Sequence, residues 1–356
     1  MSLTQLEQFR ATMAHEAHER MLFYASFTPD LERRVREAHG LGPNDSLENH
    51  FGMYAPVPVN LRPPDGLVPP DFSDYYCDID IPEGAKIDAF GVLHTPGSLY
   101  HFTHRVSPLR HAARIEDIEA FPYPNVDGYL DDHMAGRVEA AHGAGRAAGC
   151  WIGHIYEVSW QIRGYEEFLV DMVERPEWCA HILDRLTERN VQHAEAAARA
   201  GVDFIRTGDD VANQNALMFS LPYWRTFMKP RWARVYEAAR RIKPDIEIWY
   251  HSDGNIQAII PELIEIGVTM LNPVQPECMD PVEIKRLYGD RLVIDGAIGT
   301  QTTMPFGTPE EVKRVVEERI RTLGGDGAYI ASPTHVLEPE VPLENLAAFV
   351  ETARDI

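Results

Sequence analysis

The chain has 356 residues, of which 44% are hydrophobic, so it is long and apolar enough to bury a large core. Its formal charge of −22 makes the surface strongly acidic. An acidic surface repels nucleic acid and anionic membranes, so we expect neither as a partner, although a local cationic or metal-neutralised site could still accept an anion. No apolar run approaches the roughly 20 residues that span a bilayer. The N-terminal residues lack the features of a signal peptide, and we expect a soluble, cytoplasmic protein.

The first third of the chain contains a regular segment followed by a long irregular one. Residues 4–19 are expected to form a helix, residues 20–27 a strand, and Thr28 and Pro29 are typical of the start of a second helix. Residues 43–127 are rich in proline and lack helical periodicity. Within them, 86–94 and 98–103 are interpreted as the two arms of a hairpin. An irregular stretch of this length inside a compact domain is typical of a lid or binding loop.

After residue 131 the predicted helices and strands alternate. Alternation of this kind indicates βαβ units and parallel pairing. With 20–27 we count seven strands, and we expect the eighth within 43–127. No glycine-rich phosphate loop follows the first strand, and polar residues recur at strand ends, which favours a closed barrel over an open sheet. We therefore predict a single (β/α)8 TIM-type barrel over residues 1–356, with 43–127 as an insertion or lid. The later strands are predicted at 150–156, 203–209, 247–253, 270–275, 292–298 and 328–332.

Polar side chains follow most of these strands. In a parallel barrel the carboxyl ends of all strands meet at one face, so these residues are expected to form a single site. The residues concerned are Glu157, Asp209, Asp210, His251, Asp253, Asn272, Gln275, Asp295 and His335.

His251 and Asp253 are two residues apart on an extended segment, so both side chains project the same way. A histidine and a carboxylate on one side suit a divalent metal, and His335 could complete a three-ligand site of the catalytic zinc type. The alternative is that Asp253 caps a helix beginning near Ile256 and that His251 hydrogen-bonds to a neighbouring strand.

The adjacent carboxylates Asp209 and Asp210 could bind metal, act as acid and base, or cap a helix, and alternation allows at most one of them to face the pocket. Glu157 is a candidate acid or ligand, with a salt bridge to Arg163 as the alternative. Asp295 lies between apolar residues and is expected to face the barrel mouth, because an unpaired buried carboxylate is costly.

The remaining candidates are substrate contacts. Asn272 and Gln275 offer amides that can orient a ligand. Tyr54, with Tyr75, Tyr76 and Phe90, is expected to wall the pocket from the 43–127 region. Trp160 and Arg206 complete the predicted substrate-binding set.

From about residue 201 to 355 the motifs resemble the uroporphyrinogen decarboxylase superfamily. The most specific stretch is 333–345, which looks like that family's last strand and its Pro-x-Glu-Asn helix start, and 208–210, 251–254 and 295–301 strengthen the match. The decarboxylase branch carries an N-terminal Arg-Gln-Ala-Gly-Arg motif that holds the substrate's carboxylates. No such motif occurs here.

The other branch contains corrinoid-linked methyltransferases, whose zinc is bound by His-x-Cys and a later Cys. The matching positions here are His251, Asp253 and His335. The resemblance therefore implies a divalent metal, zinc first and manganese, iron or cobalt as alternatives, because the ligands are harder than in the family. Harder ligands argue against activation of a thiol acceptor and remain compatible with activation of an ether, amine or hydroxyl-bearing methyl donor.

Three functions follow as hypotheses. The leading one is a metal-dependent methyltransferase that passes a methyl group from a small donor to a corrinoid protein, with Glu157 and Asp209 or Asp210 as acid or further ligand. The second is a metal-independent decarboxylase or lyase, in which Asp209 or Asp295 acts as acid and Arg206 or Arg163 holds a carboxylate. The third is a non-catalytic binder of a small ligand or corrinoid partner. The sequence leaves the oligomeric state open.

Overall fold

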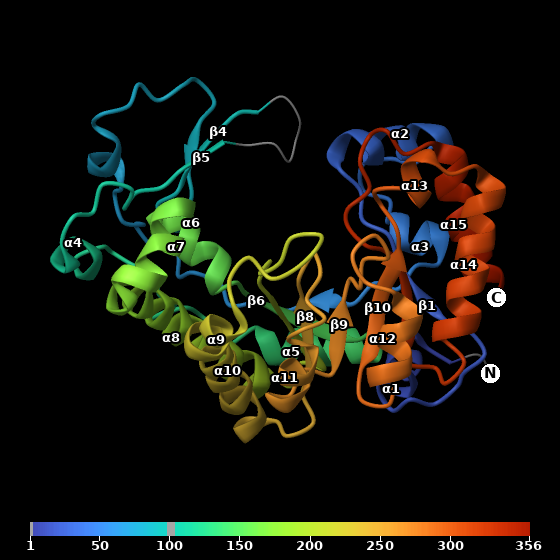
Figure 1. Ribbon diagram of the computed structural model, residues 1–356. Coiled ribbons are helices and arrows are strands. Elements are labelled where there is room, and N and C mark those ends of the chain that lie inside the picture. Colours follow the sequence, from blue (N-terminus) through green and yellow to red (C-terminus); the bar gives the residue numbers. More distant parts are fainter. Residues whose placement is uncertain (1–2, 98–103) are drawn as a thin grey trace.

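The structure, a computed structural model, describes residues 3–97 and 104–356. Eight strands form one parallel sheet in the order β1-β11-β10-β9-β8-β7-β6-β2, which curls into a barrel with helices outside it (Figure 1). The predicted (β/α)8 architecture is confirmed. The strands of the barrel are β1 (Leu22–Phe23), β2 (Val57–Pro58), β6 (Ala148–Gly153), β7 (Phe204–Gly208), β8 (Glu247–His251), β9 (Met270–Asn272), β10 (Val293–Ile298) and β11 (Tyr329–Pro333).

The eighth strand, expected within 43–127, is β2. Its residue Val57 pairs with Ala148 of β6. On the other flank of this segment, the backbone N–H of Tyr54 donates to the carbonyl of Phe23 in β1 at 2.7 Å. The segment up to Pro58 is therefore part of the barrel wall, and the excursion from the barrel begins after it.

The excursion carries a three-stranded antiparallel sheet made of β3 (Lys86–Ile87), β4 (Leu93–Thr95) and β5 (His104–Val106). Figure 1 shows this sheet beyond α6 (Tyr156–Arg163) and α7 (Tyr165–Glu174), on the side away from α14 (Pro309–Leu323) and α15 (Leu343–Asp355). The prediction of 86–94 as one hairpin arm is wrong. The chain turns at Asp88, whose carboxylate accepts hydrogen bonds from the backbone of Phe90 and Val92 at 2.8 and 3.0 Å. The other arm, 98–103, lies outside the described residues.

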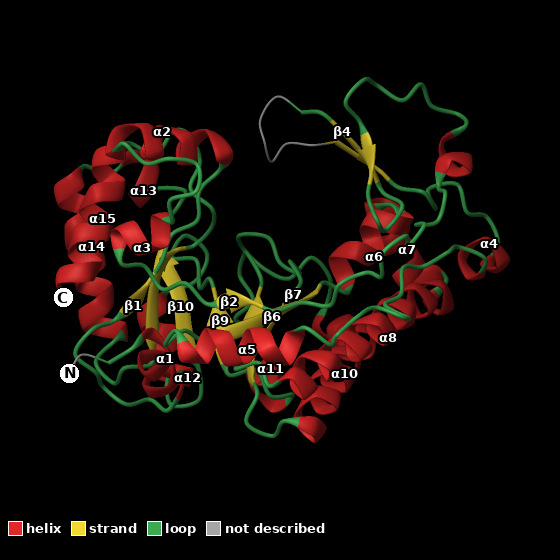
Figure 2. Cartoon of the chain, turned by 180° about the vertical axis from the view of Figure 1, so that it is seen from behind, coloured by secondary structure: helices red, strands yellow, loops and turns green. Residues whose placement is uncertain are grey.

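Most of the remaining helices cover the outside of the sheet, whereas η1 (Ser73–Tyr76) and α4 (Ile115–Glu119) belong to the excursion (Figure 2). Their boundaries follow local capping. Thr308, for example, accepts a hydrogen bond from the backbone of Glu311, whose carboxylate accepts one from the backbone of Thr308. In the described part of the chain, no helix is both long and apolar enough to cross a membrane. These elements are α1 (Gln5–Met13), α2 (Pro29–His39), α3 (Leu47–Phe51), the 3₁₀ turn η1 (Ser73–Tyr76), α4 (Ile115–Glu119), α5 (Met134–Gly143), α8 (Pro176–Ala200), α9 (Leu221–Tyr223), the π turn η2 (Trp224–Met228), α10 (Lys229–Ile242), α11 (Ile260–Glu265), α12 (Pro281–Tyr288), α13 (Thr303–Phe306), α14 (Pro309–Leu323) and α15 (Leu343–Asp355).

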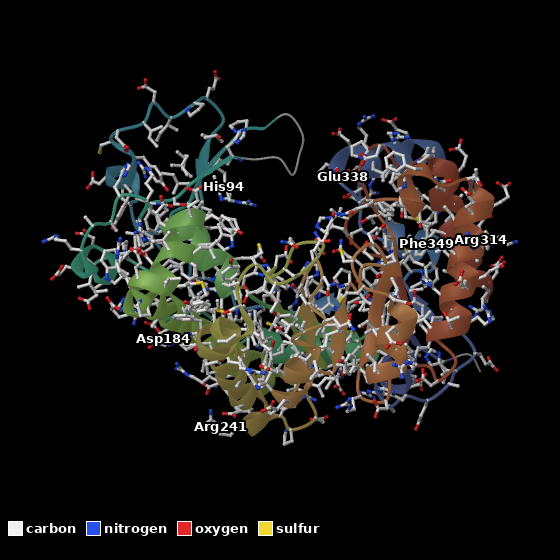
Figure 3. All side chains as sticks on the ribbon, viewed as in Figure 1. His94, Asp184, Arg241, Arg314, Glu338 and Phe349 are labelled. Atoms are coloured by element: carbon white, nitrogen blue, oxygen red, sulfur yellow. The ribbon has the colours of Figure 1, made fainter. Side chains whose placement is uncertain are left out.

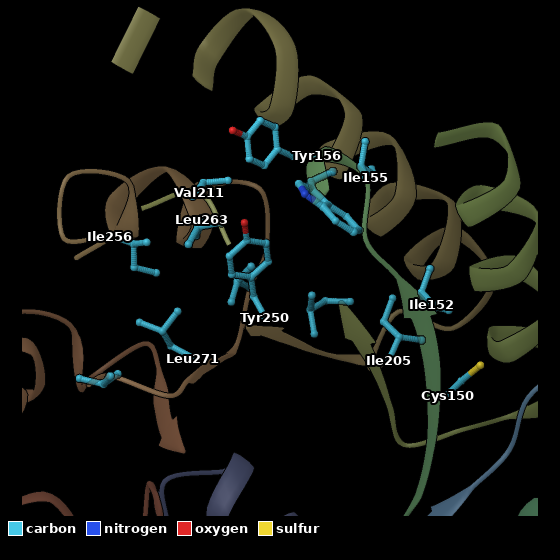
Figure 4. Packing of buried hydrophobic residues seen from close by; sticks show 14 of the residues in the cluster. Cys150, Ile152, Ile155, Tyr156, Ile205, Val211, Tyr250, Ile256, Leu263 and Leu271 are labelled. Atoms are coloured by element: carbon cyan, nitrogen blue, oxygen red, sulfur yellow. The ribbon is translucent and has the colours of Figure 1, made fainter. Parts of the chain in front are cut away.

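The larger core lies between the strands and the helices. Figure 4 shows part of it, including Tyr250 and Leu271, which pair on neighbouring strands. A second buried cluster includes residues of six barrel strands together with Leu6 and Phe9 of α1, and the Phe9 ring lies 5.4 Å from that of Phe204. Side chains therefore fill the amino-terminal end of the barrel, and the functional residues gather towards the other end.

Candidate active site and metal centre

A pocket of about 350 Å³ opens where the carboxyl ends of the strands meet. A second cavity, of about 400 Å³, shares four lining residues with it and continues into the barrel. The pocket is lined by Tyr24, Ser26, Trp151, His154, Glu157, Arg206, Asp210, Trp249, His251, Asn272, Pro333, Thr334, His335 and Val336. The residues shared with the second cavity are Tyr24, Ser26, Arg206 and Trp249. Eight of the sequence-predicted site residues therefore do line one or both cavities, namely Tyr54, Glu157, Arg206, Asp210, His251, Asn272, Asp295 and His335.

Asn272 fixes the protonation of the pocket's central histidine. Its side-chain nitrogen donates to the carbonyl oxygen of Asp295 at 3.2 Å, and a carbonyl oxygen can only accept. The amide oxygen of Asn272 therefore faces His251, at 2.6 Å from Nδ1, so Nδ1 must carry the proton. In the neutral ring the other nitrogen, Nε2, then has a free lone pair, which is the form of histidine that binds a metal.

Two carboxylates face this lone pair. Oδ1 of Asp210 lies 3.7 Å and Oδ1 of Asp253 3.8 Å from Nε2 of His251. One ligand atom from each of the three residues lies within 4.8 Å of the others. Oδ1 of Asp253 is buried without a hydrogen-bond partner among the described residues. Burial raises the pKa of Asp253, and a bound cation would compensate for the missing partner.

His335 lines the same pocket, two residues after the end of β11, but it is not part of the group formed by Asp210, His251 and Asp253. The helix-capping interpretation of Asp253 is wrong, because α11 begins only at Ile260 and has no side-chain cap. His251 does bond to a neighbouring strand through Asn272, but this contact leaves Nε2 available rather than occupying it.

His154 and Glu157 form an ion pair beside this group, where the Glu157 carboxylate also accepts a hydrogen bond from the backbone of Asp210 at 3.3 Å. Nδ1 of His154 lies 2.8 Å from the Glu157 carboxylate and 2.7 Å from the carbonyl oxygen of Gly208. Burial alone lowers the pKa of His154, but the hydrogen bond and charge of Glu157 outweigh it and raise the pKa to about 9. The alternative pairing of Glu157 with Arg163 is wrong. Arg163 is buried and binds Asp171 at 2.7 Å, so it cannot hold a substrate.

Asp209 and Asp210 point in opposite directions, as the alternation of a strand predicts. Asp210 lines the pocket, whereas Asp209 is fully buried. The Asp209 carboxylate accepts hydrogen bonds from the backbone of Ile155 and Glu157 at 2.9 and 3.1 Å and from the indole of Trp232 at 2.9 Å. Burial raises the pKa of Asp209 to about 7. It ties the start of α6 to β7 and so positions the His154–Glu157 pair.

Asp295 and Gln275 also serve mainly to position other groups. Asp295 lines the second cavity, where its carboxylate accepts hydrogen bonds from Trp249, Ser332 and Tyr24 at 2.7, 2.9 and 3.1 Å. Gln275 is buried and lines neither cavity. Its side-chain oxygen accepts the backbone N–H of the residue after Asp253 at 2.6 Å, which fixes the turn that carries this ligand.

Only some of the predicted substrate contacts line a cavity. Tyr54 lines the second cavity and Arg206 lines both. Trp160 lines neither cavity and packs against Tyr165, with ring centroids 5.4 Å apart. From the excursion, Tyr75, Tyr76 and Phe90 are likewise absent from both linings. Tyr76, for example, donates its hydroxyl to backbone carbonyls within the excursion.

Sequence reasoning missed His154 and the two tryptophans of the pocket, Trp151 and Trp249. The predicted strand 150–156 ends instead at Gly153, where the register with β7 shifts. A glycine inside an apolar run is the available signal for such an irregularity, and it would have identified His154 as the first polar residue after the strand.

Comparison with known proteins identifies the family of the chain. Residues 152–356 match the family model described as uroporphyrinogen decarboxylase (URO-D). A uroporphyrinogen decarboxylase of Hydrogenobaculum sp. (strain Y04AAS1) is 21% identical over 194 residues, covering 54% of this chain and 53% of the relative. Another, from Christiangramia forsetii, is 21% identical over 180 residues, covering 49% and 47%. The match thus spans about half the length of these curated relatives.

Among solved structures, a methyltransferase from Methanosarcina mazei superimposes over 99% of this chain and 98% of its own, with a TM-score of 0.64. At 17% sequence identity, this likeness shows that the fold is shared along the whole chain.

Proposed function

Because the chain belongs to the uroporphyrinogen decarboxylase family, we propose that it is a metal-dependent methyltransferase within it. The reaction takes a methyl group from a small donor and passes it to a corrinoid carried by a partner protein. The observation that carries the proposal is the group formed by Asp210, His251 and Asp253, in which a free imidazole lone pair faces two carboxylates. The superposable methyltransferase supports this branch by its fold alone.

The ligand group fits a divalent cation. Nε2 of His251, Oδ1 of Asp253 and Oδ1 of Asp210 would hold it, and His335, which lines the same pocket, would be a further ligand. Nitrogen and oxygen donors of this kind suit zinc first, then manganese, iron or cobalt. A cation bound there would supply Lewis acidity to the heteroatom that carries the methyl group.

His154 and Glu157 would serve the leaving group. When the methyl group departs, the heteroatom keeps the bonding electron pair and needs a proton. His154 lines the pocket, and Glu157 holds its Nδ1 while stabilising the imidazolium. Nε2 of His154 would therefore donate the proton, and Glu157 would stay ionised.

Metal content tests the site. We expect the purified protein to hold about one equivalent of metal per chain by elemental analysis. A His251→Gln/Asp253→Asn double variant should hold at most about a tenth as much. His142→Gln is the matched control, because His142 pairs with Asp203 at 2.8 Å outside the pocket lining. Equal metal in the double variant and the control would contradict the proposed ligands.

Activity separates this function from its rivals. Purified protein mixed with reduced cobalamin and a panel of methyl ethers, methylamines and methanol should form methylcobalamin, which is followed by its absorbance. Release of carbon dioxide from a carboxylated substrate, undiminished by chelation and without methylcobalamin, would instead establish the lyase. Tight ligand binding with neither product would establish a binding protein.

A further inference from the structure

A single arginine projects into the space shared by the two cavities. Arg206 lies in the middle of β7, paired in register with Trp151 of β6 and Trp249 of β8. All three side chains therefore point to the inside of the barrel. The guanidinium carbon lies 4.3 Å from the ring centroid of Trp249 and 5.8 Å from that of Trp151. The two indoles hold the cation in place through stacking and cation–π attraction.

Among the described residues, Arg206 has no ion-pair partner. In residues 3–97 and 104–356 its guanidinium takes part in no hydrogen bond and no ion pair, although the side chain is exposed to the cavities. Arg206 interacts with the Asp295 carboxyl group through its charge, but without a hydrogen bond. The carboxylate oxygens of Asp295 already accept hydrogen bonds from Trp249, Ser332 and Tyr24. A guanidinium offers five N–H donors in a fork that matches a carboxylate, and here they face open volume.

We infer that the small substrate is an anion, a carboxylate with a flat apolar body, and that Arg206 binds its charged end between Trp151 and Trp249. The inference rests on the proposed function only for the reaction at the end of the substrate that faces the metal ligands. The indoles supply the apolar walls, and the guanidinium supplies the recognition of charge. The formal charge of −22 repels anions from the rest of the surface, so a local cation is needed to admit one.

Trp249 limits the length of this substrate. Its ring centroid lies 4.3 Å from the guanidinium carbon of Arg206 and 5.8 Å from the ring centroid of His251, so the two end groups are at most about 10 Å apart. A molecule whose carboxylate lies at Arg206 would therefore present its other end to His251 and its carboxylate neighbours. This span suits a compact, ring-sized carboxylate rather than a long chain.

Calorimetric binding of benzoate, with neutral benzamide as its isostere, tests the inference on the chelated, metal-free protein. Benzoate is expected to bind at least about 10-fold more tightly than benzamide, and Arg206→Gln is expected to abolish the difference. Arg206→Lys keeps the charge but loses the fork, so it should retain part of the preference and provides a second reading if Arg206→Gln fails to fold.

Two arginines serve as controls. Arg314 lies on α14 with its side chain 69% exposed, and Figure 3 shows it pointing away from the barrel. Arg314→Gln should leave both affinities unchanged. Arg146 lines the far end of the second cavity, where it donates to the carbonyl of Ala55 at 2.6 Å, and Arg146→Gln should also retain the preference for benzoate.

The result that overturns the inference is equal binding of benzoate and benzamide, no binding of benzoate, or a preference that survives Arg206→Gln but is lost in Arg146→Gln. Metal content is measured independently of benzoate binding, and Arg206→Gln should keep the metal content of the wild-type protein. A protein that binds benzoate through Arg206 but holds no metal would overturn the proposed function and leave the substrate class standing.

Discussion

Asn272 holds His251 in one tautomer, with its amide oxygen 2.6 Å from Nδ1 and its nitrogen bonded to the carbonyl oxygen of Asp295. Asn272→Leu removes the acceptor, so the proton is free to move to Nε2 and block the metal. We expect metal affinity to fall by about 10- to 100-fold, measured by competition with a chromogenic chelator. Asn272→Asp keeps an acceptor for Nδ1 and should lose less. Equal losses in the two variants would mean that the tautomer does not matter.

The adjacent carboxylates Asp209 and Asp210 should separate stability from metal binding. Asp209→Asn puts an amide nitrogen against the backbone and indole donors that the carboxylate now satisfies, and we expect it to lower the free energy of unfolding by about 1–3 kcal/mol. Asp210→Asn should change stability little but reduce bound metal. Urea denaturation and elemental analysis of the two variants provide the comparison. If Asp209→Asn lost metal and Asp210→Asn lost stability, the structural and metal-binding roles would have to be exchanged.

The His154–Glu157 pair should make stability depend on pH. The pKa of His154 is raised from 6.5 to about 9 in the folded protein. A raised histidine pKa stabilises the fold fully below the unfolded value, and this contribution disappears as pH rises through the folded value. We expect the pair to contribute on the order of 2 kcal/mol near pH 6 and little above about pH 9.5.

The measurement for this pair is the difference in unfolding free energy between wild-type protein and His154→Gln across that range. The difference should shrink as the pH rises. His142→Gln is the control, because His142 also pairs with a carboxylate, Asp203, and lies outside the pocket. A difference that grows with pH would contradict the protonated state assigned to His154.

The buried pair of Arg163 and Asp171 should serve the fold rather than the ligand. Arg163→Met leaves the Asp171 carboxylate with only the more distant Arg175, 3.4 Å away, and we expect a loss of about 3–5 kcal/mol in unfolding free energy. The Arg163→Met/Asp171→Leu double variant should recover part of this loss. Benzoate affinity, referred to the folded fraction, should stay as in the wild type. A selective loss of benzoate binding would return Arg163 to the ligand site.

The barrel could be predicted because its strands are apolar runs that alternate with helices, and each prediction depended on local pattern. The same alternation predicted that at most one of Asp209 and Asp210 faces the pocket, and the structure places Asp210 there and Asp209 in the core. His251 and Asp253 were found because a period of two on a strand is visible in the sequence. His335 was expected in the same pocket because the ends of the strands converge at one face of a barrel, and it does line that pocket.

What could not be predicted depends on three-dimensional volume and on irregular backbone. The register shift near Gly153 turns His154 into the pocket and moves Glu157 into the first turn of α6. No periodic pattern reports such a shift. The second cavity arises from how side chains of several strands, such as Phe204 and Met270, leave space between them. Linear spacing carries no information on that space.

Trp249 lies next to both the proposed anion site and the proposed metal site. Its indole lies 4.3 Å from the guanidinium carbon of Arg206, and its ring is nearly parallel to that of His251, with centroids 5.8 Å apart. One chromophore therefore reports on two sites. Cobalt(II) bound at His251 should quench its fluorescence, whereas an anion at Arg206 should shift its emission. The order in which metal and substrate arrive can thus be read from a single optical signal in stopped flow.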